Sequence, residues 1–214
     1  METPSAPATE IVRHSDFVRT VHWLIAVCFL LAVATGFALY WVSILSWMQP
    51  FFGGPYGSIG VHFTSGLGLA LLTIPIFFAW RKRMRWTATD SYFVRHLREH
   101  AMRPEQVPPN DTGFFNGGQK MFFWAFVIST VIFLITGLVW WWRREPWMPP
   151  GVYPVCRTTH RVLAVIMTGG LLVHIYKATI GEPGTFASMV KGTVTASWAR
   201  VRRPGWFREL DGGK

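Results

Sequence analysis

Residues 156–180 form an apolar stretch that is long enough to cross a membrane as a helix, and it carries two histidines, His160 and His174. Fourteen residues at 100° each leave these side chains about 40° apart around the helix axis, so they share one face. At 1.5 Å per residue they lie roughly 21 Å apart along the axis, within a hydrocarbon layer about 30 Å thick. Because an unpaired imidazole is costly in lipid, both are candidate functional residues, with interhelical hydrogen bonding as the structural alternative.

Three further apolar runs, over residues 21–41, 57–80 and 119–142, have spanning length. Charged residues make up only 15% of the 214 residues, against about 25% in soluble domains. The sequence therefore predicts an all-α integral membrane four-helix bundle over residues 13–180. We expect a disordered N-terminal tail over residues 1–12 and a basic cytoplasmic segment over 181–214. In that last segment an apolar stripe predicts an amphipathic element lying on the membrane or on a partner; it comprises Phe186, Met189, Val190, Val194 and Trp198.

The distribution of positive charge predicts the topology. A net charge of +10 would suggest nucleic acid as the partner of a soluble protein, but here the basic residues are segregated between loops and we expect no nucleic acid. Most of the 21 Lys and Arg residues lie in the tail, in the loop after the second run and in the C-terminal segment. The other side has Arg143, Arg144, Arg157 and Arg161. Both termini are therefore predicted to be cytoplasmic, and no cleavable signal peptide is apparent.

Helix direction assigns the histidines to two depths. His22 lies near the start of the first run and His62 near the start of the second, and successive helices run in opposite directions. This predicts an outer pair, His62 with His160, and an inner pair, His22 with His174. His14, before the first run, is predicted to be a surface residue, and His96 and His100 are predicted to lie on a solvated helical turn among charges.

Two axial imidazoles from facing helices are typical of a low-spin haem that transfers electrons. Structural zinc is a poorer fit because it takes four ligands, usually with thiolates. Cys28 and Cys156 lie in different runs, so we expect no disulfide, and the chain has no C-x-x-C-H motif for covalent haem. A histidine proton relay would need intramembrane carboxylates, and none lies in the four runs. A haem-free anchor or transporter remains the alternative of a different class.

Several motifs together resemble one family, the di-haem cytochrome b (gamma) subunit of respiratory membrane-bound formate dehydrogenase. The resemblance covers residues 13–210 or so. The motifs are R-T-V-H-W at residues 19–23, Thr35-Gly36, Val61-His62, F-N-G-G-Q-K at 115–120, the His160/His174 spacing, M-V-K-G at 189–192 and W-F-R-E-L at 206–210. The histidine pattern is also similar to that of the cytochrome b subunit of membrane-bound nickel-iron hydrogenases, which is the alternative identification.

The resemblance implies two b-type haems as cofactors, with His62 and His160 as outer ligands and His22 and His174 as inner ligands. It implies a quinone site, for menaquinone or ubiquinone, at Asn116, Gln119 and His174. It also implies a bacterial cytoplasmic (inner) membrane location and two partner chains, an iron–sulfur (beta) subunit and a catalytic molybdenum or tungsten (alpha) subunit. Formate would be oxidised there, since this chain has no cysteine cluster for iron–sulfur.

The stretch Asn116-Gly117-Gly118-Gln119 has two interpretations, a quinone contact and a helix cap. Asn and Gln both donate and accept hydrogen bonds, and glycines let the backbone approach a flat ring, which suits a quinone. Asn116 is equally a good N-cap for the third helix. Thr35-Gly36 is likewise ambiguous between room for a planar cofactor and close helix packing, and Thr136-Gly137 echoes it in the third run.

Overall fold

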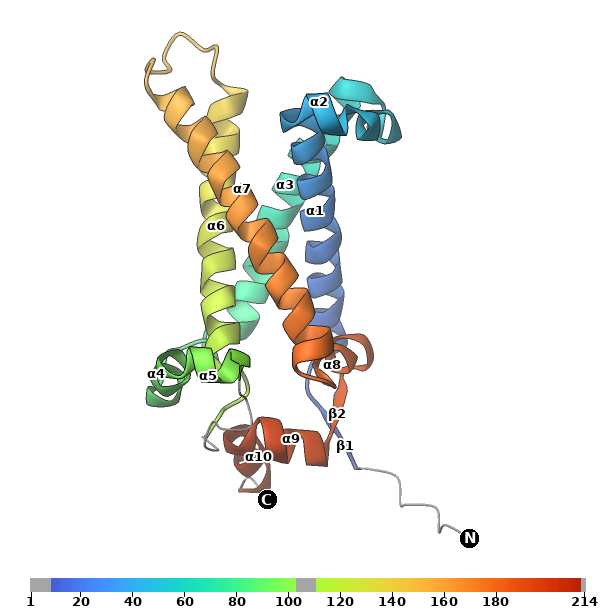
Figure 1. The fold of residues 1–214 in the computed structure, drawn as a ribbon, viewed down its shortest axis with the longest axis vertical. Helices are drawn as coiled ribbons and strands as arrows, with labels where there is room; N and C mark the ends of the chain where they lie inside the picture. Colours follow the sequence, from blue (N-terminus) through green and yellow to red (C-terminus); the bar gives the residue numbers. More distant parts are fainter. Residues whose placement is uncertain (1–8, 103–110, 213–214) are drawn as a thin grey trace. The chain divides into compact units, whose positions relative to one another are not determined.

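The computed structural model describes residues 9–102 and 111–212, and its α-helices and β-strands are labelled in Figure 1. Four long helices dominate it: α1 (Asp16–Tyr40), α3 (Gly54–Trp80), α6 (Gly117–Trp141) and α7 (Val152–Tyr176), the last continued by a π-helical turn, Lys177–Gly181. The shorter elements are β1 (Glu10–Val12), α2 (Val42–Leu45), a 3₁₀ helix (Ser46–Phe52), α4 (Ala88–Arg95), α5 (Leu97–Met102), α8 (Thr185–Lys191), β2 (Thr193–Thr195), α9 (Ala196–Arg202) and α10 (Pro204–Asp211).

The four long helices are long and apolar enough to cross a membrane, as predicted. They leave large apolar side chains exposed along one face, for example Ile128, Val131 and Ile135 on α6. Such a face is costly in water and suits lipid. The predicted all-α class with four candidate membrane spans is therefore confirmed; each helix begins two to five residues earlier than the apolar run alone predicted.

The chain divides into two compact units. The second unit, Thr20–Ala79 with Ala125–Val173, contains most of the four long helices. Its core brings one buried side chain from each of α1, α3 and α7 together, Phe29, Leu69 and Met167, and α6 adds Phe126 and Phe133 against them. Packing of large apolar side chains at these positions holds the helices around the site described below.

The first unit comprises Met1–Arg19, Trp80–Trp124 and His174–Lys214. Here β1 pairs with β2 in an antiparallel register, Glu10 with Thr195 and Val12 with Thr193. A disordered tail was expected over residues 1–12; residues 10–12 form this strand, whereas residues 1–8 lie outside the described part of the chain.

The C-terminal segment is not one amphipathic element. Gly192 ends α8 with a φ of +86°, and a side chain there would meet the backbone of His14 and the guanidinium of Arg19. After this turn Val194 is buried in β2, whereas Val190 in α8 is exposed. The predicted single stripe is therefore wrong, because its members belong to three elements, the helix α8, the strand β2 and the helix α9.

Candidate functional site

His62 and His160 face each other in the second unit. His62 lies in the third turn of α3 and His160 in the third turn of α7, and their ring centroids are 6.1 Å apart. The structure thus brings together the two histidines that the depth argument assigned to the outer pair.

The separation of the two rings fits coordination of one metal between them. A metal–imidazole bond is about 2 Å long and the ring centre lies about 1 Å behind the bonding nitrogen, so two axial imidazoles have centroids about 6 Å apart. Among the described residues no cluster of three or more His, Cys, Asp or Glu side chains comes together, so the pair lacks the further ligands that structural zinc needs.

The pair opens onto a cavity of about 470 Å³, within the usual range for cofactor sites. Its walls are mostly apolar and aromatic and include three glycines; members include Gly36, Phe37, Gly66, Phe133, Leu134 and Gly137. An apolar slot with two facing imidazoles suits a flat macrocycle with a central metal. The residues present therefore fit a b-type haem.

Each histidine is held by a threonine from a neighbouring helix. The Thr35 hydroxyl on α1 lies 3.2 Å from His62 Nδ1, and the Thr136 hydroxyl on α6 lies 2.7 Å from His160 Nδ1. Gly36 permits this approach, because a Cβ there would lie 2.9 Å from His62 Cε1. Sequence reasoning identified both Thr-Gly dipeptides but assigned no contact to either threonine; their repetition was the available signal.

Two arginines line the same cavity, Arg143 and Arg161. The Arg161 guanidinium lies over the Tyr40 ring, 4.3 Å from its centroid, and the Arg143 side chain donates to its own helix end at Trp140 O. Cations at the cavity wall suit the carboxylates of haem. Sequence analysis placed both arginines on the outer side through the charge distribution alone; Arg161 directly follows the ligand candidate His160.

The inner pair is not assembled within one unit. His22 belongs to the second unit and His174 to the first, and their pairing stays a prediction. Within the first unit His174 stacks on Phe122, with centroids 4.7 Å apart and planes 12° from parallel. Phe122 lies one turn after Gln119 on α6, so His174 packs beside the beginning of that helix.

The beginning of α6 is closed by a reciprocal cap. Gln119 N donates to Asn116 Oδ1 at 2.9 Å, and Asn116 N donates to Gln119 Oε1 at 3.1 Å. The N-cap interpretation is thus confirmed. The flat ring that Gly117 and Gly118 accommodate is Phe93 of α4, since a Cβ at either glycine would lie 3.0–3.2 Å from it. Both amide oxygens are engaged, so the two side chains offer an incoming ligand their NH₂ donors.

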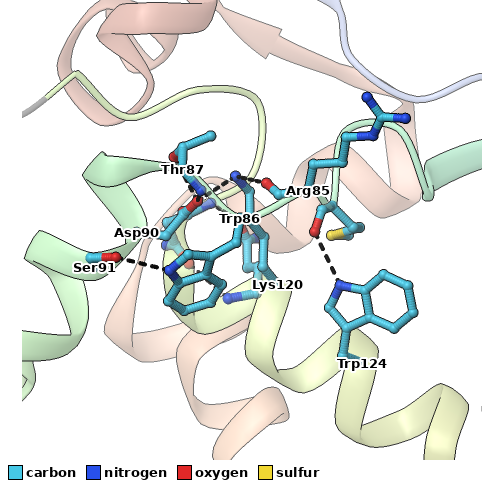
Figure 2. Close-up of polar contacts among 10 residues, drawn as sticks. Arg85, Trp86, Thr87, Asp90, Ser91, Lys120 and Trp124 are labelled. Carbon is cyan, nitrogen blue, oxygen red and sulfur yellow. Dashed lines mark hydrogen bonds and ion pairs between the residues drawn. The ribbon is translucent and has the colours of Figure 1, made fainter.

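A buried ion pair fixes the loop before α4 against α6. Lys120 Nζ lies 2.7 Å from Asp90 Oδ2 and donates to the carbonyl of Arg85, while Trp124 Nε1 donates to the carbonyl of Met84 (Figure 2). Asp90 also accepts from Thr87 at the start of α4 (Figure 2). The capped start of α6 therefore has a rigid polar support.

A second buried ion pair approaches the cap from the C-terminal helices. Arg203 Nη1 lies 2.6 Å from Glu182 Oε1, and Arg203 Nη2 donates to Gln119 Oε1 at 3.2 Å. Arg13 lies among the Phe114, Trp198 and Trp206 rings and donates to the carbonyl of Phe114. Burial, with the nearby charge of Arg203, lowers the pKa of Arg13 to about 9, and the Glu182 carboxylate partly opposes this.

Three histidines outside the pairs were predicted to be solvated. For His14 this is wrong: its side chain is buried against the rings of Trp80, Phe114 and Phe115. His96 is half-buried; its ring centroid lies 4.1 Å from that of Tyr92, with the planes tilted by 30°, and its Nδ1 lies 2.9 Å from the carbonyl oxygen of Tyr92. The side chain of His100 lies outside the described part of the structure.

Comparison with known proteins agrees with this geometry. A family model described as prokaryotic cytochrome b561 matches residues 13–192. The chain is 32% identical over 203 residues to the formate dehydrogenase cytochrome b556(fdo) subunit of Escherichia coli strain K12, covering 94% of this chain and 93% of the relative. It is 31% identical over 211 residues to the formate dehydrogenase cytochrome b556 subunit of Haemophilus influenzae, covering 94% of this chain and 84% of the relative. It is 25% identical to the nitrate-inducible cytochrome b556(Fdn) subunit of E. coli K12, with coverage of 94% and 92%.

Proposed function

The chain belongs to the prokaryotic cytochrome b561 family as a formate dehydrogenase cytochrome b subunit, and from this membership we propose that it carries electrons through two b-type haems to quinone. The single observation that carries the proposal is the facing pair His62 and His160 at the wall of an apolar cavity. These two imidazoles would hold the iron of the outer haem. When bound, the haem supplies a one-electron carrier; the chain supplies the ligands, the apolar walls and the cations Arg143 and Arg161 for its propionates.

The inner haem is proposed at His22 and His174. Their place rests on helix direction and on the family, with both termini cytoplasmic and the protein in the bacterial inner membrane. In that orientation a di-haem domain over residues 13–180 moves electrons from the outer to the inner surface, and residues 181–214 lie on the cytoplasmic side.

Quinone reduction is proposed at the beginning of α6, at Asn116, Gln119 and His174. A quinone accepts two electrons and two protons to become a quinol, so its carbonyl oxygens need donors beside an electron source and near water. Two observations support the site: the side-chain oxygens of Asn116 and Gln119 are already engaged, which leaves their NH₂ groups to donate, and His174 packs beside this turn. Protons taken from the cytoplasm and electrons from the outer face would together build a transmembrane potential.

The electron donor is proposed to be an iron–sulfur subunit, with a separate molybdenum or tungsten subunit oxidising formate. It would dock at the outer face, near residues 42–56 and 143–157, because the outer haem would be reachable from that side. Large apolar side chains are exposed there, including Ile44, Trp47, Phe51 and Tyr56. Cross-linking that joined the donor only to residues 81–115 would contradict this arrangement. A separate experiment, identification of the co-purified large subunit, distinguishes a formate dehydrogenase from a nickel-iron hydrogenase.

Haem quantification of histidine variants tests the central proposal. The purified complex should show a b-type reduced-minus-oxidised spectrum with two haems per chain. His62→Ala or His160→Ala should each remove one haem, and His22→Ala or His174→Ala the other, measured as pyridine haemochrome. Loss of both haems in every variant, with the helical content intact, would contradict two separate sites. A wild-type chain that contained no haem would favour the alternative function, a haem-free membrane anchor or transporter.

A further inference from the structure

Thr35 and Thr136 occupy equivalent places in the second unit. Each directly precedes a glycine near the end of its helix, and each hydroxyl contacts the Nδ1 atom of a histidine on the next long helix of the chain. Thr136 is buried at 5% exposure and Thr35 at 0%, so water does not substitute for them.

The position of the ring proton follows from the acceptors around Nδ1. His62 Nδ1 lies 3.0 Å from the carbonyl of Ala32, and because a carbonyl oxygen can only accept, Nδ1 must carry the proton. Thr35 donates its own proton to the carbonyl of Leu31 at 2.6 Å, so its oxygen is a second acceptor for the same N–H.

The same argument applies to His160. Thr136 donates its hydroxyl proton to the carbonyl of Ile132 at 2.7 Å, which leaves its oxygen to accept from His160 Nδ1, also at 2.7 Å. Both imidazoles are therefore held in the tautomer whose Nε2 atom keeps its lone pair, and Nε2 would be the nitrogen with which each ring coordinates a shared metal.

We propose that Thr35 and Thr136 are positioning residues of the outer haem site, and that Thr136 sets the donor strength of one axial imidazole. The proposal deepens the proposed function and rests on it. An acceptor at the far nitrogen fixes the ring orientation and raises the basicity of the ligating nitrogen. A more basic ligand stabilises the ferric state, so these hydroxyls lower the midpoint potential of the outer haem.

The two sides of the site are unequal. Within the described part of the chain, His160 Nδ1 has the Thr136 hydroxyl as its hydrogen-bond partner, whereas His62 Nδ1 has both the Ala32 carbonyl and the Thr35 hydroxyl. Removing Thr136 therefore leaves an unsatisfied N–H, while removing Thr35 leaves His62 its backbone acceptor. Removing Thr136 should therefore change the midpoint potential of the outer haem more than removing Thr35.

The experiment is a redox titration of the haems in the intact complex, followed optically, for Thr136→Val and a matched control. Thr130→Val is the control: Thr130 is on the same helix, is equally buried and donates to the carbonyl of Phe126 on its own helix, whereas the hydroxyl of Thr136 also reaches His160. In Thr136→Val the potential of one haem should shift in the positive direction. Thr35→Val should shift it less in the same direction, and Thr136→Ser should restore the wild-type value.

The outcomes separate the inference from the proposed function. If Thr136→Val titrates like Thr130→Val, the inference is overturned while the haem proposal stands. If Thr136→Val loses one haem, retention in Thr136→Ser and Thr130→Val supports the inference, and equal loss in all three overturns it in favour of packing alone. A wild-type chain without haem would overturn the proposed function, and the inference with it.

Discussion

Replacing Glu182 with Gln should selectively destabilise the C-terminal helices of the first unit. The carboxylate neutralises Arg203 at 2.6 Å, with side-chain exposures of 11% for Glu182 and 3% for Arg203, and its charge also offsets part of the cost of burying the charge on Arg13. Removing one partner of a buried ion pair costs about 3–5 kcal/mol, because the other charge stays buried without compensation. Because 1.4 kcal/mol changes an equilibrium constant tenfold, the equilibrium constant for local opening of α9 and α10 should rise roughly 100- to 4,000-fold.

Hydrogen exchange followed by mass spectrometry on peptides covering residues 193–212 measures this opening. Asp111→Asn is the matched control, since Asp111 pairs with Arg208 in the same unit but both side chains are more than half exposed. An exposed pair contributes about 0–1 kcal/mol, so the control should change exchange by roughly fivefold or less. Exchange in Glu182→Gln that matched the control would refute the reasoning. The double variant Glu182→Gln with Arg203→Met should exchange more slowly than the single one, because it strands no charge on Arg203.

Two further predictions concern the proposed cofactor sites. Gly36→Ala places a Cβ 2.9 Å from His62 Cε1, and this overpacking should weaken the binding of one haem by about 1–3 kcal/mol and lower its occupancy. In the control Gly137→Ala the new Cβ lies 3.9 Å from His160 Cε1, so this variant should bind both haems. Equal haem content in the two variants would contradict the close contact at Gly36. Gln119→Ala should slow haem reoxidation by quinone several-fold without changing haem content or haem reduction by the donor, and an unchanged quinone reductase rate would assign Gln119 to the helix cap alone.

The spans and the outer histidine pair were predictable because their signals are local. Each span is a run of apolar residues, and helix order with alternating direction is enough to bring His62 and His160 to the same depth. The structure adds the contact itself, with centroids 6.1 Å apart. Nothing beyond chain order and hydropathy was needed to expect it.

The support around the beginning of α6 could not be predicted from local patterns. Arg13 donates to the carbonyl of Phe114, 101 residues away, and Arg203 reaches Gln119 across 84 residues. His14 lies in a polar stretch that predicts exposure, but the aromatic rings that bury it come from Trp80 and from residues 114–115. Such burial depends on which distant segments meet, and a single sequence carries no signal for that.

The two Thr-Gly dipeptides show how the outer site is built from two similar hairpins. Thr35 precedes His62 by 27 residues and Thr136 precedes His160 by 24, and in each case the chain passes from one long helix to the next. Each half of the second unit therefore supplies one imidazole together with the hydroxyl that orients it. Each orienting contact is made within its own hairpin, whereas the packing around Phe29, Leu69 and Met167 joins the two halves and thereby sets the distance between the rings. A site assembled this way is preorganised for a ligand that binds between two fixed donors, which is the geometry that a low-spin haem requires.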